Sequence, residues 1–266
     1  MNQFLWRLSV FKSRWRNRWR YLVSAPRVYR NWWVWPLPKL GISVILELRN
    51  GLRYLVRAGS SDLAVLNEAV LINPYLADHY VHVAEDAVVV DVGASAGDFA
   101  IQVAALCPRG RVFAIEPVSE NARMIEVNRA LNKLSNIEVL PVALGADEGE
   151  MAIHLAGSQS SAYFNFERPA ERVPVISLPR LMHDRGIEGI DLLKLDCEGA
   201  EWDILPACKS VLTRIDQICM EFHPRDGWTG ARLADWLRDA GYQVRYIQGG
   251  WSGLLWASRR PEQAAS

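Results

Sequence analysis

The stretch "VVVDVGASAGDFA", residues 88–100, decides how this chain folds. A short β-branched run of this kind is typical of a strand buried inside a parallel sheet. Gly93 and Gly97 then form a turn, after which the apolar spacing becomes helical. In open α/β sheets, ligands bind at this strand-to-helix edge. The stretch therefore predicts the first strand and the first helix of a ligand-binding α/β sheet.

The residues of this turn indicate which ligand it takes. A dinucleotide fingerprint needs glycine at positions 95 and 98, where this chain has Ser95 and Asp98. Asp91 adds a second carboxylate at the end of the strand. Because a pyrophosphate at a helix N-terminus prefers positive potential, two carboxylates argue against a dinucleotide. They suit a ligand with a positively charged end, such as S-adenosylmethionine, which has an ammonium group, a sulfonium group and no phosphate.

A third acid belongs to the same expected pocket. The second expected strand, residues 111–117, has Glu116 near its end, 19 residues after Gly97. From this position an acid accepts hydrogen bonds from ribose hydroxyl groups. The cofactor site predicted from these residues consists of Asp91, Gly93, Ser95, Gly97, Asp98 and Glu116.

Strand and helix patterns alternate along the rest of the chain. Strands are expected over 111–117, 137–144, 190–196 and 217–223, and helices over 97–107, 119–134, 178–186, 200–212 and 230–242. Antiparallel pairs are expected from 150–157 with 173–178, and from 243–248 with 253–259. This alternation predicts an α/β fold with a doubly wound Rossmann-like sheet, mostly parallel with an antiparallel final strand.

Two local features qualify this pattern. Residues 45–59 contain two alternating runs around Asn50-Gly51, the favoured pair for a type I′ turn, and predict a hairpin before the sheet. Pro206 cannot continue a regular helix, so we expect a break there, with Pro206 beginning a second helical piece.

The stretch "KLDCEGAEWD", residues 194–203, places four carboxylates within ten residues. Asp196 ends a strand and Glu198 lies in the loop after it, so both are expected to line the cleft and to act in catalysis. Glu201 and Asp203 fall in the first turn of the next helix. Acids at that position stabilise the helix dipole, and for these two residues this structural role explains their presence at least as well as a role in the site.

Other side chains near this edge receive separate predictions. His223 ends the following strand and is the best histidine candidate for a general base, because an unperturbed imidazole titrates near neutrality. Lys194 is expected to point to the opposite face or to pair with an acid. Cys197 is expected to pack rather than to act as a nucleophile. Oxygen ligands of this kind suit magnesium, but no obligatory metal is expected.

These motifs resemble those of the FkbM-type methyltransferases. The resemblance runs from about residue 45 to 256 and is carried by "VVVDVGASAGDFA", "GRVFAIEPVSENARMIEVNRALN", "VLPVALGADEG", "DLLKLDCEGAEWDIL" and "ICMEFHP". Its most specific part is the K-x-D-x-E-G-x-E signature that begins at Lys194. The resemblance implies a class I enzyme that uses S-adenosyl-L-methionine to methylate a hydroxyl oxygen, and it adds Ala143 to the cofactor site.

The first 40 residues differ from the rest of the chain. They hold nine Lys and Arg residues and no acid, whereas the remaining 226 residues carry 21 basic and 30 acidic residues. An apolar stripe predicts an amphipathic helix, formed by Phe4, Leu8, Phe11, Trp15, Trp19 and Leu22. Such a helix suits contact of residues 1–36 with an anionic membrane, or docking on the protein itself. A nucleic-acid arm is the weaker alternative.

The expected organisation is a basic head (1–40), a hairpin and helix (41–85), a methyltransferase domain (86–258) and a tail (259–266). No apolar run is long enough to span a bilayer, and the four cysteines have neither zinc nor disulfide spacing. These features favour a cytoplasmic protein, associated with the inner face of the membrane if the head binds lipid.

The combined sequence features favour an O-methyltransferase that acts on a hydroxyl of a sugar in a glycan or lipid-linked saccharide. Two alternatives remain at this point: an NAD-dependent oxidoreductase, and a non-catalytic nucleic-acid-binding protein on the same fold. The acceptor pocket is expected to come from residues 156–172 and from the N-terminal region.

Overall fold

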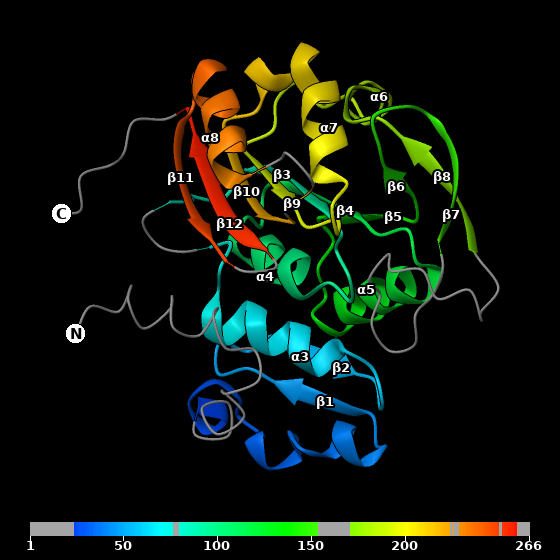
Figure 1. Cartoon of the computed structure of the whole chain (residues 1–266). Coiled ribbons are helices and arrows are strands. Elements are labelled where there is room, and N and C mark those ends of the chain that lie inside the picture. The colour runs from blue at the N-terminus through cyan, green and yellow to red at the C-terminus, as the bar shows by residue number, and fades with distance from the viewer. Residues whose placement is uncertain are drawn as a thin grey trace, which may run out of the picture.

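A seven-stranded sheet forms the centre of the computed structural model, which describes residues 24–76, 80–153, 171–223, 225, 229–249 and 252–259 (Figure 1). The strand order is β11-β12-β10-β9-β3-β4-β5. The strands are β3 (Val88–Val92), β4 (Arg111–Ile115), β5 (Ile137–Leu140), β9 (Leu192–Leu195), β10 (Gln217–Phe222), β11 (Gln243–Gln248) and β12 (Gly253–Ser258). Within this described sheet, β12 alone runs in the direction opposite to the other six strands, so its pairs with β10 and β11 are antiparallel and the remaining pairs are parallel. The predicted Rossmann-like sheet with an antiparallel final strand is therefore confirmed.

Helices cover both faces of this sheet. One face carries α4 (Asp98–Leu106) and α5 (Ser119–Leu131), and the other carries α6 (Leu178–Asp184), α7 (Glu201–Ala207) and α8 (Gly230–Asp239) (Figure 1). Successive strand residues alternate between two cores: Val89 belongs to the α4 side and Val90 to the side of α6–α8. Burial on both faces explains why the β3 sequence is apolar at nearly every position.

An N-terminal unit packs against the α4 side of the sheet (Figure 1). It contains a helical segment at residues 24–28, η1 (Trp32–Val34), η2 (Leu37–Leu40), β1 (Val44–Glu47), β2 (Arg53–Val56), α3 (Asp62–Asn67) and the π-helical η3 (Glu68–Ile72). Leu46 and Tyr54 of the hairpin share one apolar cluster with Phe99 of α4. The N-terminal unit therefore completes the core beneath this face of the sheet.

The hairpin is confirmed, but its turn is not type I′. A type I′ turn needs positive φ at both central residues, and of Asn50 and Gly51 only Gly51 has one, at 93°. The Gly51 N–H donates to the Leu48 carbonyl at 3.0 Å, so the tight turn lies one residue earlier. Gly51 then occupies the left-handed position that follows a type I turn in three-residue hairpin loops.

The predicted break at Pro206 is wrong by a short distance. Pro206 lies inside α7, which continues to Ala207 before the 3₁₀ turn η4 (Cys208–Ser210). Pro206 is the next-to-last residue of α7, and because it has no N–H, the helix lacks the one hydrogen bond that this group would donate. A second 3₁₀ turn, η5 (Leu212–Arg214), leads into β10.

A small separate sheet has the order β6-β8-β7. Its strands are β6 (Ala143–Leu144), β7 (Gly149–Ile153) and β8 (Glu171–Ile176), and β7 pairs antiparallel with β8 as predicted. The single strand expected over 137–144 is instead divided at Pro141 between the two sheets, because proline cannot donate to a ladder.

Several predictions fall outside the described residues. They include the amphipathic helix of residues 4–22, His154, most of the segment 156–172 and nearly all of the tail 259–266. Within the described part, no helix is both long and apolar enough to cross a bilayer.

Candidate active site

Four parallel strands end at the same edge of the sheet and bring the predicted site residues together. Val92 of β3 is in register with Ile115 of β4 and with Leu195 of β9. The residues that follow these strands therefore emerge side by side, and β10 adds His223 next to them. The sequence prediction that this edge holds the site agrees with the strand register.

Gly93 allows the first two loops of the site to touch. Its φ is 75°, and a Cβ atom there would lie 1.9 Å from the backbone oxygen of Asp196. Gly97, with φ 87°, stands directly before α4, where a Cβ atom would lie 3.3 Å from Ile125. Only glycine at 93 permits this approach of the turn to the loop that carries Asp196.

A buried ion pair lies beneath the glycine turn. Lys194 Nζ is 3.0 Å from Asp91 Oδ1 and donates to the carbonyl oxygen of Gly93 at 2.7 Å. Burial raises the pKa of Asp91, and the Lys194 charge opposes that shift. Burial lowers the pKa of Lys194, but the charges of Asp91 and Asp196 outweigh it, so its pKa is raised. Lys194 therefore pairs with an acid, one of its two predicted roles, and stays charged.

Asp196 receives a hydrogen bond that the sequence did not predict. The Tyr75 hydroxyl, from the N-terminal unit, donates to Asp196 Oδ2 at 2.9 Å. Tyr75 is only 7% exposed and meets Phe99 edge to face. Burial and the nearby Asp196 charge raise the pKa of Tyr75 well above its usual value, so its hydroxyl stays protonated. Asp196 is thus held by a donor from outside the methyltransferase motifs.

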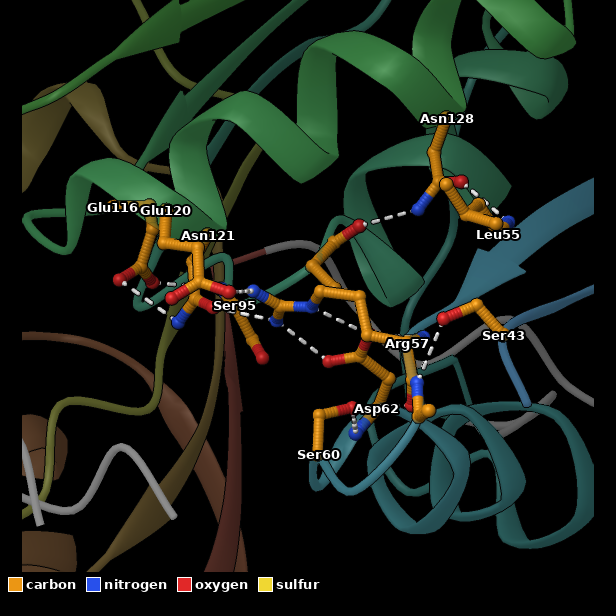
Figure 2. A network of polar contacts seen from close by, with 12 residues as sticks. Ser43, Leu55, Arg57, Ser60, Asp62, Ser95, Glu116, Glu120, Asn121 and Asn128 are labelled. Carbon is orange, nitrogen blue, oxygen red and sulfur yellow. Dashed lines mark hydrogen bonds and ion pairs between the residues drawn. The ribbon is translucent and has the colours of Figure 1, made fainter. Parts of the chain in front are cut away.

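Glu116 lies beside the glycine turn, as its predicted ribose-binding role requires. It is 5% exposed and accepts a hydrogen bond from the backbone N–H of Ser95 at 2.8 Å (Figure 2). It also accepts one from the backbone N–H of Val118 at 3.0 Å. The Asn121 amide makes a longer contact of 3.5 Å. Burial raises the pKa of Glu116 to about 7, against the effect of these donors.

Two asparagines of α5 connect the hairpin to this pocket (Figure 2). Asn121 accepts a hydrogen bond from Arg57 at 2.8 Å while its amide nitrogen faces Glu116. Asn128 accepts from the Leu55 N–H at 2.8 Å and donates to the Ala96 carbonyl in the glycine turn at 2.9 Å. The hairpin therefore supports both the acid and the turn of the predicted cofactor site.

Arg57 is the polar centre of this connection. Its guanidinium makes two hydrogen bonds to Asp62, at 2.7 and 2.8 Å, and one to Glu120 at 2.9 Å (Figure 2). Asp62 is 4% exposed, whereas the Glu120 side chain is 71% exposed. The contact with Asp62 therefore fixes the guanidinium, which in turn orients Asn121.

His223 lies among three glutamates. Its ring nitrogens are 3.4 Å from Glu198, 3.6 Å from Glu201 and 4.0 Å from Glu221. Burial lowers the pKa of His223, but the glutamates outweigh that effect and raise it to about 9. A pKa raised this far favours the protonated imidazole at neutral pH, which argues against the base role predicted for His223.

The two acids expected at the start of α7 have different environments. Glu201 is fully buried and accepts the Cys197 N–H at 2.9 Å, so it organises the loop around Glu198. Asp203 is exposed and pairs with Arg225 at 3.0 Å. Burial also raises the pKa of the Cys197 thiol, which agrees with a packing role.

The remaining predicted residues lie at the same edge or just beyond it. Asp98 is half-buried at the start of α4, and removal from water raises its pKa to about 7, with Lys194 opposing the shift. Ser95 and Glu198 have left-handed φ values of 51° and 54°, a conformation that non-glycine residues adopt mainly at functional loops. Ala143 is buried in β6, three residues after Leu140, whose carbonyl accepts the Glu116 N–H.

The acidic side chains of the pocket favour one chemical class of ligand. Asp91, Asp98 and Glu116 are acids whose pKa values burial raises, and within the described residues both Asp91 oxygens are buried without a hydrogen-bond donor other than the Lys194 ion pair. Such a site favours a ligand with a positive charge and hydroxyl donors. Among the described residues, no three His, Cys, Asp or Glu side chains are grouped to hold a metal ion.

Several known proteins are similar to parts of this chain. The AMB antimetabolite synthetase AmbE of Pseudomonas aeruginosa is 30% identical over 61% of this chain, which spans about a tenth of AmbE's length. The 2-O-methyltransferase NoeI of Sinorhizobium fredii is 24% identical over 54% of this chain and 67% of its own. A solved methyltransferase FkbM from Methylobacillus flagellatus covers 74% of this chain and 53% of its own, with 16% identity and a TM-score of 0.47.

The family model described as methyltransferase FkbM domain matches residues 91–244, from the acid of the buried ion pair to the strand β11. This match covers more than half of the chain and includes the glycine turn, Glu116, Asp196 and His223. The chain therefore belongs to the FkbM methyltransferase family.

Proposed function

We propose that this protein transfers a methyl group from S-adenosyl-L-methionine to a hydroxyl oxygen. The observation that carries the proposal is the position of Asp196, which Tyr75 holds at the strand edge in backbone contact with the Gly93 turn. This arrangement places a carboxylate beside the cofactor turn, where an acceptor hydroxyl needs a base.

The residues present fit this cofactor. Its positive charges complement the half-buried acid Asp98, and its ribose hydroxyls suit Glu116. Asp91 is fully buried and paired with Lys194, so it supports the turn from beneath. The carboxylates also make the turn unfavourable for the pyrophosphate of NAD, which disfavours an oxidoreductase. When bound, the cofactor supplies an electrophilic methyl group on sulfur.

The protein's own residues then have distinct tasks. Asp196 accepts the hydroxyl proton as the new O–CH₃ bond forms and the S–CH₃ bond breaks, which leaves S-adenosylhomocysteine and a methyl ether. Tyr75 holds one oxygen of Asp196, so the other remains available to the acceptor. Lys194, which is 3.9 Å from Asp196, balances the negative charge of this edge. Glu198, in the same loop as Asp196, and protonated His223, directly after β10, suit contacts with acceptor hydroxyls.

We further propose that the acceptor is a sugar hydroxyl in a glycan or lipid-linked saccharide, and that methylation takes place in the cytoplasm or at the inner face of the membrane. Support comes from the similarity to NoeI, whose name describes a 2-O-methyltransferase. A pair of a charged imidazole and a carboxylate also suits the polar rim of a sugar better than an apolar acceptor.

Calorimetry tests the cofactor, and mass comparison tests the acceptor. The full chain is titrated with S-adenosylhomocysteine and with NAD, and we expect binding of the first alone. Binding of NAD alone would replace this proposal with the oxidoreductase. Glycans and lipids from cells with and without the gene are then compared by mass, and a shift of one methylene, about 14 daltons, is expected in a saccharide fraction. Absence of this shift from every saccharide fraction would refute the proposed acceptor class.

A further inference from the structure

The N-terminal unit has a cluster of exposed apolar side chains. Eight large hydrophobic side chains are exposed in the described part of the chain, and five of them fall between residues 32 and 45. We name these five the N-terminal patch: Trp32 (47% exposed), Trp33 (63%), Leu40 (72%), Ile42 (51%) and Ile45 (44%). Concentrated exposure of this kind marks an interaction surface.

Local structure explains why these side chains face outward together. Trp35, the residue after η1, is buried and its indole N–H donates to Asn67 at 3.1 Å. It anchors the end of η1, whose own two tryptophans are exposed to solvent. The rings of Trp32 and Trp33 meet edge to face at 6.5 Å. Asn31 joins η1 to β1 by a 2.8 Å hydrogen bond to the Ile45 carbonyl, which places Ile45 beside the tryptophans.

The charges around the patch have one sign. Residues 24–61 carry six Lys and Arg residues and a single acid, Glu47, which is paired with Arg30 at 2.7 Å. Arg27, Lys39 and Arg49 are also exposed in this segment. The 23 residues that precede it add six basic residues and no acid, whereas residues 62–266 carry 18 basic and 29 acidic residues. The segment 24–61 that bears the patch therefore has a net positive charge, whereas residues 62–266 have a net negative charge.

We propose that the N-terminal patch docks on an anionic lipid bilayer. Tryptophan prefers the interface between headgroups and acyl chains, and Leu and Ile side chains gain from burial just below it. The surrounding Arg and Lys side chains attract anionic headgroups. A second copy of the chain is a poor occupant, because two patches of the same positive charge repel each other. This docking does not depend on the methyl-transfer reaction.

The orientation of the molecule follows from this surface. The patch lies on η1, η2 and β1, at the end of the protein opposite α6–α8 (Figure 1). The hairpin that carries Ile45 also reaches the cofactor pocket through Arg57 and Asn121. A bilayer on this end is therefore next to the unit that supports the site, which suits an acceptor attached to a lipid.

Flotation of the full chain with vesicles tests the proposal. We expect binding to vesicles of phosphatidylcholine with about a quarter phosphatidylglycerol at about 0.1 M salt, and much weaker binding to phosphatidylcholine alone. The double variant Trp32→Ala/Trp33→Ala should lower the partition coefficient at least about tenfold. Affinity for S-adenosylhomocysteine serves as the check that the fold is intact.

Matched controls separate the patch from general apolarity and charge. Ile42 and Leu106 are both 51% exposed, so Ile42→Ser should weaken vesicle binding and Leu106→Ser should not. Lys39→Gln should weaken binding to the anionic vesicles, while Lys209→Gln on η4 should leave it unchanged.

Four results would overturn the proposal: absence of binding to anionic vesicles, equal binding to both vesicle types, equal effects of each variant and its control, or loss of binding only when residues 1–23 are deleted. A dimer in gel filtration that the tryptophan variant dissolves would instead assign the patch to self-association.

Discussion

Tyr75 and Asp196 are 121 positions apart in the sequence, yet the tyrosine hydroxyl donates a 2.9 Å hydrogen bond to the aspartate. The bond joins the N-terminal unit to the strand edge where the methyl group would be transferred. The bond also distinguishes two variants, because Asp196→Asn removes the proposed base whereas Tyr75→Phe removes only the hydrogen bond that holds it.

Asp196→Asn should lower the rate of methyl transfer about 10²- to 10⁴-fold, with little change in affinity for S-adenosylhomocysteine. Tyr75→Phe keeps the packing against Phe99 and loses only the hydrogen bond, so transfer should fall about 10- to 100-fold. Rates are measured with the acceptor identified by the mass comparison. Full activity of Asp196→Asn would assign proton removal to His223 instead.

Gly93→Ala should destabilise the protein more than Gly51→Ala does. Both glycines have positive φ, 75° and 93°, so both substitutions carry a backbone cost of about 1–2 kcal/mol. Only at Gly93 does the added Cβ meet a backbone oxygen, at 1.9 Å, which forces the two loops apart. Urea denaturation compares the two variants, and equal losses of unfolding free energy would contradict the close approach of these loops.

Lys194→Met should cost about 3–5 kcal/mol of unfolding free energy, because it leaves the Asp91 carboxylate buried without its cation. The pKa of Asp91 is already raised, and this variant removes the charge that opposes the shift. A group with a raised pKa stabilises the fold at low pH and loses that contribution as the pH rises through its folded pKa. The variant should therefore recover stability as the pH is lowered, which a pH series of thermal unfolding would show. Parallel curves for wild type and variant would refute this.

Cofactor affinity should rise with pH near neutrality. Asp98 and Glu116 each have a pKa of about 7 in the protein, and a cationic ligand with ribose hydroxyls favours their ionised forms. Below pH 7, each of these two acids should lower the affinity by up to about tenfold for every pH unit, and above pH 8 the affinity should be constant. Calorimetry in buffers with different ionisation enthalpies should detect proton release on binding, and Glu116→Gln should flatten part of the slope. A constant affinity from pH 5.5 to 8.5 would exclude these acids from the pocket.

Asn121→Ala should weaken binding of S-adenosylhomocysteine about 5- to 10-fold, because Glu116 loses its amide contact and Arg57 loses one acceptor. Glu120→Ala is the control, since Glu120 is bound by the same guanidinium but is largely exposed. It should change the affinity less than about twofold. If both variants behave alike, the connection through Asn121 does not position Glu116.

The sequence alone supports much of the fold and part of the site. The β-branched runs and helical spacings lead to the correct strands because parallel strands are apolar at almost every position, as in β9. Strand ends then bring Glu116, Asp196 and His223 to one edge without any knowledge of side-chain contacts.

The features that the sequence did not predict depend on distant packing. Tyr75 and Arg57 contact residues 121 and 64 positions away, and neither belongs to a recognisable motif. The raised pKa of His223 depends on the burial of Glu201, which a helix-start pattern does not reveal. Local exceptions arise the same way: the turn at Gly51 follows from the hydrogen bond to Leu48, and Pro141 divides one expected strand between two sheets.

The two hydrogen bonds of Asn128 limit how far this protein can be shortened from its N-terminus. The family match begins at residue 91, but the Leu55 N–H that fixes Asn128, and through it the Ala96 carbonyl, lies well before that point. An expression fragment designed on the matched range would leave the apolar side of α4 uncovered and the glycine turn without its tether. A soluble fragment that retains cofactor affinity should therefore begin no later than the hairpin, and fragments that start near residue 86 should aggregate.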